Sequence, residues 1–234
     1  FSPAIAADEL RYGVRREVRK PPRVETLTFR NDSSQKALPA RDWNAFQMGY
    51  SVGGAGKHWA ANAWRFNPSD FEMATRHKER YNNMPLADGL ILQDWGVSYA
   101  ELEPFYDRVE KIAGISGKAG VLNGSTQEGG NPFEGNRTSE YPTPPLIRSH
   151  WNDTFHNITT KMGYHPCPIP AGTIGASFTN PLGINLAPCT YVGYCGFYGC
   201  GNWSKASPNI CVVPALMDRT NFTLLTECTA LYIN

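Results

Sequence analysis

The sequence predicts a mixed α/β fold, and three observations support this prediction. Two segments carry apolar residues at helical spacing, two shorter segments have a strand-like composition, and a glycine-dense stretch lies near residue 55. With 234 residues, the chain is long enough to form one large domain or parts of two. It contains no internal repeat and no low-complexity tract.

Two segments are expected to form strands. Val24 to Phe29 alternates apolar and polar residues, as a short half-buried strand does. Phe222 to Ile233 is rich in β-branched and apolar residues, which is typical of a buried strand. This strand would have no sheet partners after Asn234, and the sequence begins at Phe1 rather than at a Met. We therefore expect the sequence to be the middle of a longer chain.

A first helix is expected over roughly residues 103–113. Ser98 and Glu101 form a capping box, in which each side chain accepts a hydrogen bond from the other residue's backbone amide. Pro104 is tolerated near a helix start, and Gly114 is a typical residue just past a helix end. The apolar residues that repeat at helical spacing, and are expected to face the core, are Phe105, Val109 and Ile112.

A second helix is expected from Ser149 to Met162, with Gly163 ending it. The members of its apolar stripe, which we expect to lie in the core, are Trp151, Phe155, Ile158 and Met162. Residues 117–146, between the two helices, are rich in Gly, Asn and Pro. A long irregular segment of this kind is expected to be a lid or a crossing loop.

Composition argues against some classes of function. The formal net charge of +1 gives no electrostatic reason to expect nucleic acid or an acidic membrane as the partner. No apolar run approaches the roughly 18 residues of a membrane-spanning helix.

Asn-x-Ser/Thr triplets are unusually frequent. Seven occur where chance predicts roughly two, which favours a glycosylated protein of the secretory pathway. Asn-rich loops in a bacterial protein would give the same count, so both interpretations stay open. The triplets begin at Asn31, Asn123, Asn136, Asn152, Asn157, Asn202 and Asn221.

The six cysteines leave two interpretations open. Cys189, Cys195 and Cys200 fall within twelve residues. Closely spaced thiolates in a glycine-containing loop suit an iron–sulfur cluster, and Cys211 could assist if the chain folds back. A disulfide within the loop is the competing interpretation, which secretion would favour. Zinc fits poorly, because the loop has no His and no Cys-x2-Cys pair.

The stretch from Gly49 to Asn62 is the strongest candidate for a ligand site. Its glycines Gly53, Gly54 and Gly56 can adopt positive φ and let backbone amides approach a ligand closely. Such loops often lie against a pyrophosphate or a flat ring, where amide donors offset negative charge. The pattern alone is weak, since tight turns explain most runs of this kind.

Within this stretch, Val52 to Trp59 (VGGAGKHW) resembles the second flavin-binding motif of the glucose–methanol–choline oxidoreductase family. The sequence is similar to the large flavoprotein subunits of gluconate 2-dehydrogenases from about Asp8 to Asn234. The other motifs that carry the resemblance, in chain order, are Glu25–Asn31, Trp64–Phe71, Gln93–Gly96, Gly114–Gly120, Glu128–Gly135 and Lys205–Pro208.

The resemblance implies an FAD-binding Rossmann-like domain together with a substrate domain, of which only the middle portion is present. Residues 1–97, with the flavin-contact loop, would belong to the FAD-binding domain. Residues 98–185 would form part of the substrate or lid domain. Residues 186–234, with the cysteine loop and a return strand, would rejoin the FAD-binding domain.

The resemblance also implies which residues contact FAD. They are Val52, Gly53, Gly54, Gly56, Lys57, His58, Trp59, Ala60, Asn62 and Ala230. His58 matches the position at which several relatives bond a histidine to the 8α-methyl carbon of the flavin. An imidazole is a suitable nucleophile for that carbon, and a packed histidine is the alternative. Many relatives carry asparagine where Trp59 stands, so the group near flavin N5 stays open.

Two further positions bear on this comparison. Lys57 would favour an anionic reduced flavin, although a solvent-facing lysine is the commoner case. Relatives often have a fourth cysteine where Val192 stands here, and its absence weakens the case for an iron–sulfur site.

The implied reaction is oxidation of a hydroxyl group of a sugar or sugar acid by hydride transfer to FAD. Electrons would pass to a quinone or cytochrome, with small and cytochrome c subunits as partners. The protein would be secreted or periplasmic and associated with the membrane through a partner subunit. The alternatives are a sugar oxidase that reduces oxygen to peroxide, and a cofactor-free, disulfide-linked secreted binding module.

Two parts of such an enzyme are missing from the sequence. No Gly-x-Gly-x-x-Gly follows a strand, although that loop normally opens an FAD domain. The histidines that do not match the family's catalytic pair are His77, His150, His156 and His165. We therefore name no catalytic base and expect this stretch alone to be inactive.

Overall fold

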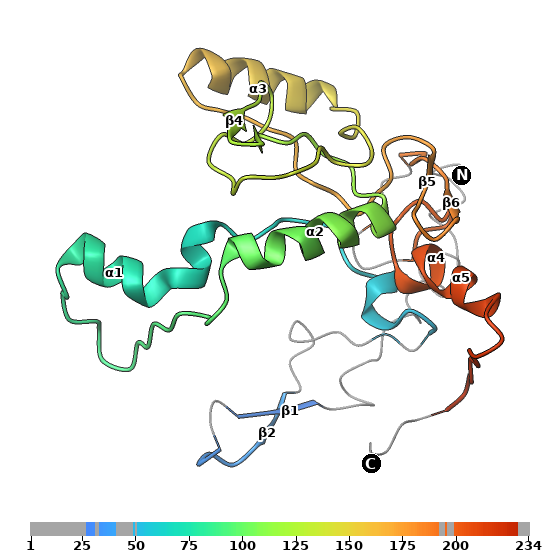
Figure 1. Cartoon of the computed structure of the whole chain (residues 1–234), viewed down its shortest axis with the longest axis horizontal. Coiled ribbons are helices and arrows are strands. Elements are labelled where there is room, and N and C mark those ends of the chain that lie inside the picture. Colours follow the sequence, from blue (N-terminus) through green and yellow to red (C-terminus); the bar gives the residue numbers. More distant parts are fainter. Residues whose placement is uncertain are drawn as a thin grey trace.

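The computed structural model describes residues 27–30, 33–40, 49, 51–191, 195 and 199–228 (Figure 1). Within them, helices alternate with short antiparallel strand pairs and long irregular segments, which is a mixed α/β composition. The helices are η4 (Gly54–Lys57), η5 (Pro68–Glu72), α1 (Met73–Tyr81), α2 (Tyr99–Ala113), α3 (His150–Lys161), α4 (Pro208–Cys211) and α5 (Val213–Met217), of which η4 and η5 are 3₁₀ helices. The strands are β1 (Leu27–Phe29), β2 (Leu38–Ala40), β3 (Val121–Leu122), β4 (Ser125–Thr126), β5 (Phe178–Thr179) and β6 (Asn185–Leu186).

The strands pair only as neighbours along the chain. β1 pairs with β2, β3 with β4 and β5 with β6, each antiparallel and two-stranded. The first predicted strand is confirmed over Leu27–Phe29, while residues 24–26 lie outside the described residues. The second prediction is wrong for Phe222 to Cys228, where no strand forms; residues 229–233 lie outside the described part. A β-branched composition forms a strand only where another strand accepts its hydrogen bonds.

Helix α2 confirms the first helix prediction and begins four residues earlier. The Ser98 hydroxyl accepts a hydrogen bond from the Glu101 amide at 3.2 Å, and the Glu101 carboxylate accepts one from the Ser98 amide at 2.7 Å. Gly114 ends the helix with a φ of 66°. The prediction of its inward face is wrong for Phe105 and Val109, which are 61% and 62% exposed, while Ile112 is half-buried.

The inward face of α2 instead carries Tyr99, Glu103 and Glu110, all buried. These positions lie on one side of the helix, since they are four and seven residues apart. Burial of two carboxylates is tolerated because arginines from other segments neutralise them, as described below.

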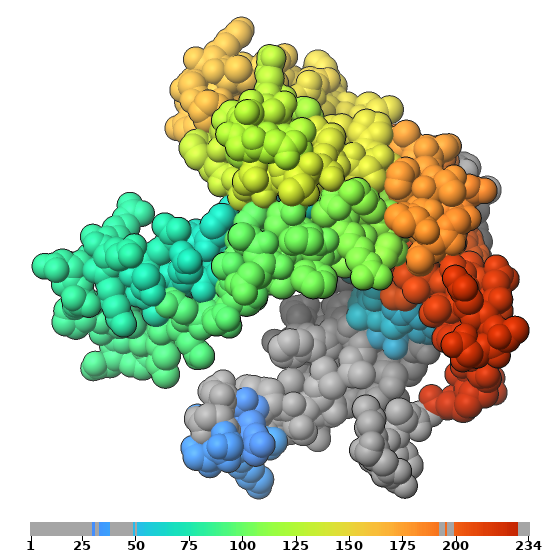
Figure 2. All heavy atoms as spheres, in the orientation of Figure 1, coloured from blue at the N-terminus to red at the C-terminus, as the bar shows by residue number. Residues whose placement is uncertain are grey.

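Helix α3 confirms the second helix prediction, and Ser149 caps it by accepting a hydrogen bond from the Asn152 amide at 3.3 Å. The expectation that its apolar stripe lies in the core is wrong. The exposed fractions are 79% for Trp151, 64% for Phe155, 54% for Ile158 and 65% for Met162. Among the described residues, no element covers this face, and α3 lies at the edge of the molecule (Figures 1 and 2).

Residues 117–146 are mostly irregular, as expected, but pack closely. Arg137, Tyr141 and Thr143 are buried, and the Arg137 amide donates to the Val121 carbonyl at 3.0 Å. Arg137 also reaches Glu110 of α2 with its guanidinium group. The segment is therefore held against α2 rather than standing away from it as an open lid.

A short ladder of backbone hydrogen bonds forms the centre of the molecule. The Gly172 amide donates to the Ala61 carbonyl at 2.6 Å, and the Ala206 amide donates to the Gly172 carbonyl at 2.6 Å. Beside this ladder lies the main apolar cluster, which contains Ile174 and Leu186. Residues 59–63, 171–174 and 204–206 are thus brought together from three distant parts of the sequence. None of the helices in the described part of the chain is long and apolar enough to cross a membrane.

Candidate functional site

The glycine-rich loop forms a tight turn. Gly53 and Gly54 have φ angles of 97° and 54°, in the left-handed region that glycine adopts without strain. The Gly54 amide donates to the Ser51 carbonyl at 2.8 Å, and the His58 amide donates to the Ala55 carbonyl at 3.1 Å. The expectation of positive φ is therefore confirmed for Gly53 and Gly54, whereas Gly56 does not adopt a positive φ.

The two faces of this loop have different surroundings. A side chain at Gly53 would come within 2.6 Å of the Asn209 amide oxygen, and one at Gly56 within 3.0 Å of the Pro208 ring. A side chain at Gly54 would meet no described residue within 4 Å. Among the described residues, the loop therefore packs against residues 208–209 on one face and is open at Gly54. Figure 2 shows the cyan atoms of this loop against the red atoms around α4.

Trp59 fixes the end of the loop to the core. Its indole nitrogen donates a hydrogen bond to the Ala206 carbonyl at 2.8 Å, and its ring packs against the central apolar cluster. A side chain at Gly172 would come within 2.5 Å of the ring, so only glycine fits there. Buried Lys205 donates to the Trp59 carbonyl at 2.9 Å. In this structure the Trp59 ring acts as a packing residue that supports the loop.

The other predicted contact residues of this stretch differ in exposure. His58 is buried, with 7% of its surface exposed. Ala60 and Asn62 are exposed, and Val52 and Lys57 are half-buried. Ala230 lies outside the described residues.

Sequence reasoning missed one residue of the loop. The Ser51 hydroxyl is buried and has no hydrogen-bond partner among the described residues. A buried hydroxyl without a partner is costly, so this atom is a candidate to face a ligand. No motif singled it out, because an isolated serine carries no pattern.

The cysteine loop lies beside this site, since Lys205 also donates to the Cys195 carbonyl at 2.6 Å. Burial, with Cys189 and Cys200 nearby, raises the pKa of Cys195. Burial also acts to raise the pKa of Cys200, but hydrogen bonds from Ser204 and from backbone amides hold it below its ordinary value. The three thiols are therefore electrostatic neighbours in distinct environments.

The structure bears on both interpretations of these cysteines, the disulfide and the iron–sulfur cluster. All six cysteines are free thiols, so the disulfide expected in this loop is not formed. Within the described part of the chain, no group of three or more His, Cys, Asp or Glu side chains is arranged to hold a metal ion. The iron–sulfur assignment for Cys189, Cys195 and Cys200 stays a prediction, and Val192 lies outside the described residues.

A buried ion-pair network lies next to the loop, on the chain that follows it. Arg65 donates to both carboxylate oxygens of Glu110 at 2.8 Å and to Glu103 at 3.1 Å. Arg137, fully buried, also binds Glu110 and lies 3.8 Å over the ring of Tyr141. Burial lowers the pKa of Arg65, but the contacts with Glu110 and Tyr99 more than offset this and raise it above the ordinary value. Glu103 and Glu110 share one face of α2 because they are seven residues apart, but no short sequence pattern indicates their arginine partners.

No protein-family model matches the chain. The chain is 36% identical over 230 residues to the gluconate 2-dehydrogenase flavoprotein of Pantoea cypripedii, which covers 97% of this chain and 37% of that protein. It is 28% identical over 141 residues to the fructose dehydrogenase large subunit of Gluconobacter japonicus, covering 59% of this chain and 22% of that protein. A 2-methyl-1,2-propanediol dehydrogenase of Mycolicibacterium austroafricanum is 31% identical over 118 residues, covering 50% and 18% respectively.

The chain thus spans little more than a third of the length of the first of these relatives, and less of the other two. The match to the gluconate 2-dehydrogenase flavoprotein nevertheless extends over almost the whole of the chain, including the glycine-rich loop and the segment that packs against it. The relatives of this chain are thus flavoprotein dehydrogenases and oxidases of the glucose–methanol–choline type.

Proposed function

We propose that this chain supplies the flavin-contact loop of an FAD-dependent dehydrogenase that oxidises a hydroxyl group of a sugar or sugar acid. One structural observation carries the proposal most directly. The turn at residues 53–58 is supported by Trp59 and Pro208 on one side, and on the other side no described residue lies within 4 Å of a side chain placed at Gly54. When bound, FAD accepts a hydride from the carbon that bears the hydroxyl group.

The residues present fit a flat, partly anionic group. The open Gly54 position lets such a group approach the backbone, and the Ser51 hydroxyl supplies a hydrogen-bonding group without a protein partner among the described residues. Lys57, in the last turn of η4, adds positive charge. Val52, Gly53, Gly56, Ala60 and Asn62 complete the proposed contact set from this stretch, and Ala230 belongs to it by resemblance.

His58 is proposed as a covalent attachment point for the flavin. The fixed position of His58 at the end of η4 supports the proposal, while its burial equally fits the packed histidine given as the alternative. The test uses the full-length polypeptide containing this sequence. Flavin absorbance that stays with acid-precipitated wild-type protein, and is lost in His58→Ala, supports the bond. Complete release of flavin from the wild type contradicts it.

The division into FAD-binding residues 1–97 and 186–234 and substrate-domain residues 98–185 is also proposed. Support comes from direct packing of the loop at 53–59 against residues 205–209, across the intervening segment. Residues 171–174 hydrogen-bond to both sides, so the two parts share the central ladder. A Rossmann-like arrangement of the FAD-binding part belongs to the same proposal.

The electron acceptor is proposed to be a quinone or cytochrome, with partner subunits, in a secreted or periplasmic enzyme. The names of two relatives, a "flavoprotein" and a "large subunit", support an assembly with other chains. A sugar oxidase is the second candidate, and the similarity to a paromamine 6'-oxidase of Streptomyces fradiae favours it.

Turnover of the full-length enzyme distinguishes these candidates. Reduction of a quinone analogue by gluconate or fructose, without peroxide, is expected. Peroxide formation at a matching rate would establish the oxidase instead. A full-length protein that contains no bound flavin would contradict both the dehydrogenase and the oxidase. The cofactor-free binding module would then be the remaining candidate.

A further inference from the structure

We propose that a cavity beside the buried ion-pair network binds a neutral polyhydroxyl compound, of the size of a monosaccharide. The cavity is separate from the glycine-rich loop, because residues 64–67, 99, 131, 134–135 and 141 line it and residues 52–59 do not. It encloses about 240 Å³. That space holds several water molecules, which a single sugar ring could displace.

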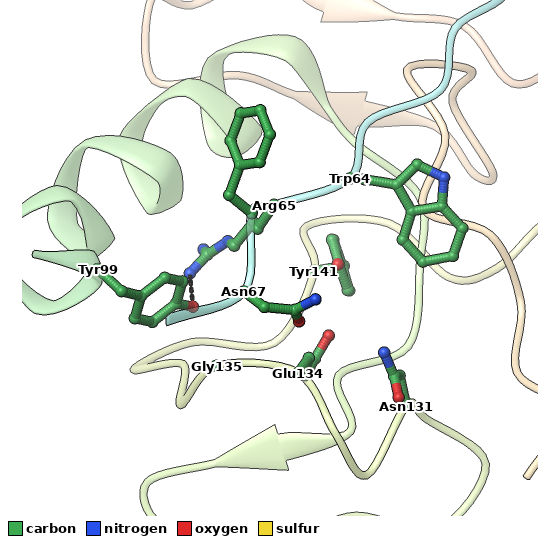
Figure 3. A pocket seen from close by; sticks show the side chains of 9 residues that line it. Trp64, Arg65, Asn67, Tyr99, Asn131, Glu134, Gly135 and Tyr141 are labelled. Carbon is green, nitrogen blue, oxygen red and sulfur yellow. Dashed lines mark hydrogen bonds between the residues drawn. The ribbon is translucent and has the colours of Figure 1, made fainter. Parts of the chain in front are cut away.

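The cavity has rigid walls. Tyr99 forms one wall. Its ring lies so close to Gly135 that a Cβ atom at this position would be 2.5 Å from Cζ of Tyr99. Its hydroxyl is held by Arg65 at 3.1 Å, the bond drawn in Figure 3. Tyr141 forms another wall and is held by Arg137 stacked on its ring. A cavity held by buried ion pairs is preorganised, so a ligand does not have to order it.

Three polar groups in the cavity are available to a ligand. Glu134 uses one carboxylate oxygen to accept from the Gly120 amide at 2.6 Å and the Val121 amide at 3.3 Å. Asn131 uses its amide oxygen to accept from the Phe133 amide at 3.1 Å.

The second Glu134 oxygen, the Asn131 amino group and the Tyr141 hydroxyl bind no other described residue. Figure 3 shows the side chains of Asn67, Asn131, Glu134 and Tyr141 gathered around one space. An acceptor, a donor and a hydroxyl so placed match the alternating donors and acceptors of neighbouring sugar hydroxyl groups.

The charge of the lining favours a neutral ligand. Arg65 and Arg137 are balanced by Glu103 and Glu110, which they bind directly. Glu134 has no cationic partner among the described residues and adds one negative charge to the cavity. An anionic sugar acid would be repelled, whereas a neutral sugar or polyol would not.

An aromatic face completes the cavity. Trp64 lines it and is 53% exposed, so the cavity opens to solvent at this side chain. Ligand pockets combine such apolar surface with a few fixed polar groups. The Trp64 ring is placed to cover the C–H face of a sugar ring, while the polar groups hold its hydroxyls.

The experiment measures binding of methyl α-D-glucopyranoside, a neutral glycoside, to the full-length protein by titration calorimetry. Wild type is expected to bind it, and D-gluconate is expected to displace the glycoside from this cavity only at a concentration at least tenfold higher. Glu134→Gln keeps an oxygen that accepts hydrogen bonds from the Gly120 and Val121 amides, but it removes the second, free acceptor oxygen and the negative charge. This variant is expected to weaken glycoside binding about tenfold. It is also expected to reduce the ratio between the affinity of the cavity for the glycoside and its affinity for gluconate.

Controls separate this site from the flavin site and from unfolding. Glu128→Gln, at an exposed position in the same segment, is expected to leave the glycoside dissociation constant unchanged. Asn131→Ala is a second variant that tests the cavity independently of Glu134. The measurement does not require flavin, so it stands whether or not the proposed oxidoreductase function holds.

Two outcomes overturn the proposal. Wild-type protein that binds no glycoside rejects the site outright. A dissociation constant unchanged in both Glu134→Gln and Asn131→Ala places any glycoside binding elsewhere.

Discussion

The indole nitrogen of Trp59 lies 2.8 Å from the carbonyl oxygen of Ala206, a residue 147 positions further along the chain. This hydrogen bond joins the glycine-rich loop to the segment that begins α4. Lys205 strengthens the connection by donating to the Trp59 carbonyl from the other segment. The position of the loop is therefore set by tertiary contacts and not by its own turn alone.

Replacing Trp59 with Phe is expected to destabilise the protein by about 1–3 kcal/mol. The variant leaves the buried Ala206 carbonyl without its donor while keeping most of the ring. Thermal unfolding of the full-length protein measures the effect, and Trp151→Phe, at a 79% exposed position, is the matched control expected to change stability by less than about 0.5 kcal/mol. Equal effects of the two substitutions would show that the hydrogen bond is unimportant.

Replacing Gly54 with Leu is expected to remove bound flavin from the full-length protein. The side chain would enter space that no described residue occupies, where we propose that the cofactor approaches. Gly129→Leu is the control, because Gly129 also has a positive φ, of 79°, and open surroundings. Both variants carry similar backbone strain, so the ratio of flavin to protein absorbance isolates the blocked site. Flavin retained by Gly54→Leu would remove the loop from the cofactor site.

Replacing Glu110 with Gln is expected to cost about 3–5 kcal/mol of unfolding free energy. Arg65 and Arg137 both bind this carboxylate, and the variant leaves buried positive charge with insufficient compensation. Glu72→Gln is the matched control, because Glu72 pairs with Arg76 on the surface and such pairs contribute at most about 1 kcal/mol. Chemical denaturation provides both values, and a small loss for Glu110→Gln would contradict the assigned role of the network.

Glu140 is expected to make stability depend on pH. Burial acts to raise the pKa of this carboxyl group, but hydrogen bonds from Lys118 and from the Ala119 and Tyr141 amides lower it below its ordinary value of 4.5. Because the folded pKa lies below the unfolded one, the carboxylate stabilises the fold above the unfolded pKa. This contribution is lost as the pH falls through the folded value.

A comparison with Glu140→Gln tests this sign. Wild type is expected to be more stable than the variant at pH 7, and the difference is expected to shrink as the pH is lowered below about 4.5. Denaturation series at several pH values measure it. A difference that grows with acidification would reverse the assignment.

The local features of the fold could be predicted from the sequence because their causes are local. The Ser98–Glu101 capping box, the end of α2 at Gly114 and the positive φ of the glycine pair depend on neighbouring residues only. The face that each helix buries depends on partners far along the chain. On α2 the charged face is buried because Arg65 and Arg137 neutralise it, a pairing that no short pattern reveals.

In the candidate site, too, the sequence predicts the local motif but not the contacts that come from distant segments. Val52 to Trp59 was recognisable as a motif, but its support by Ala206 and Pro208 required the fold. The Ser51 hydroxyl and the cavity at Glu134 have no sequence signature, because both arise from the packing of separate segments. Helix α3 shows the opposite situation. Its apolar residues repeat at clear helical spacing, but this pattern does not reveal which element, if any, packs against them.

The ladder at Gly172 has a consequence for a chain that has been cut. Arg148 lies in an exposed stretch where trypsin can cut. A cut there would break the covalent connection between the piece that contains residues 61 and 116 and the piece that contains residue 171. Backbone hydrogen bonds from Ala171 to Ser116 and from Gly172 to Ala61 would still join the two pieces. Such a nicked protein would elute as one species under native conditions and divide into two fragments only in denaturant.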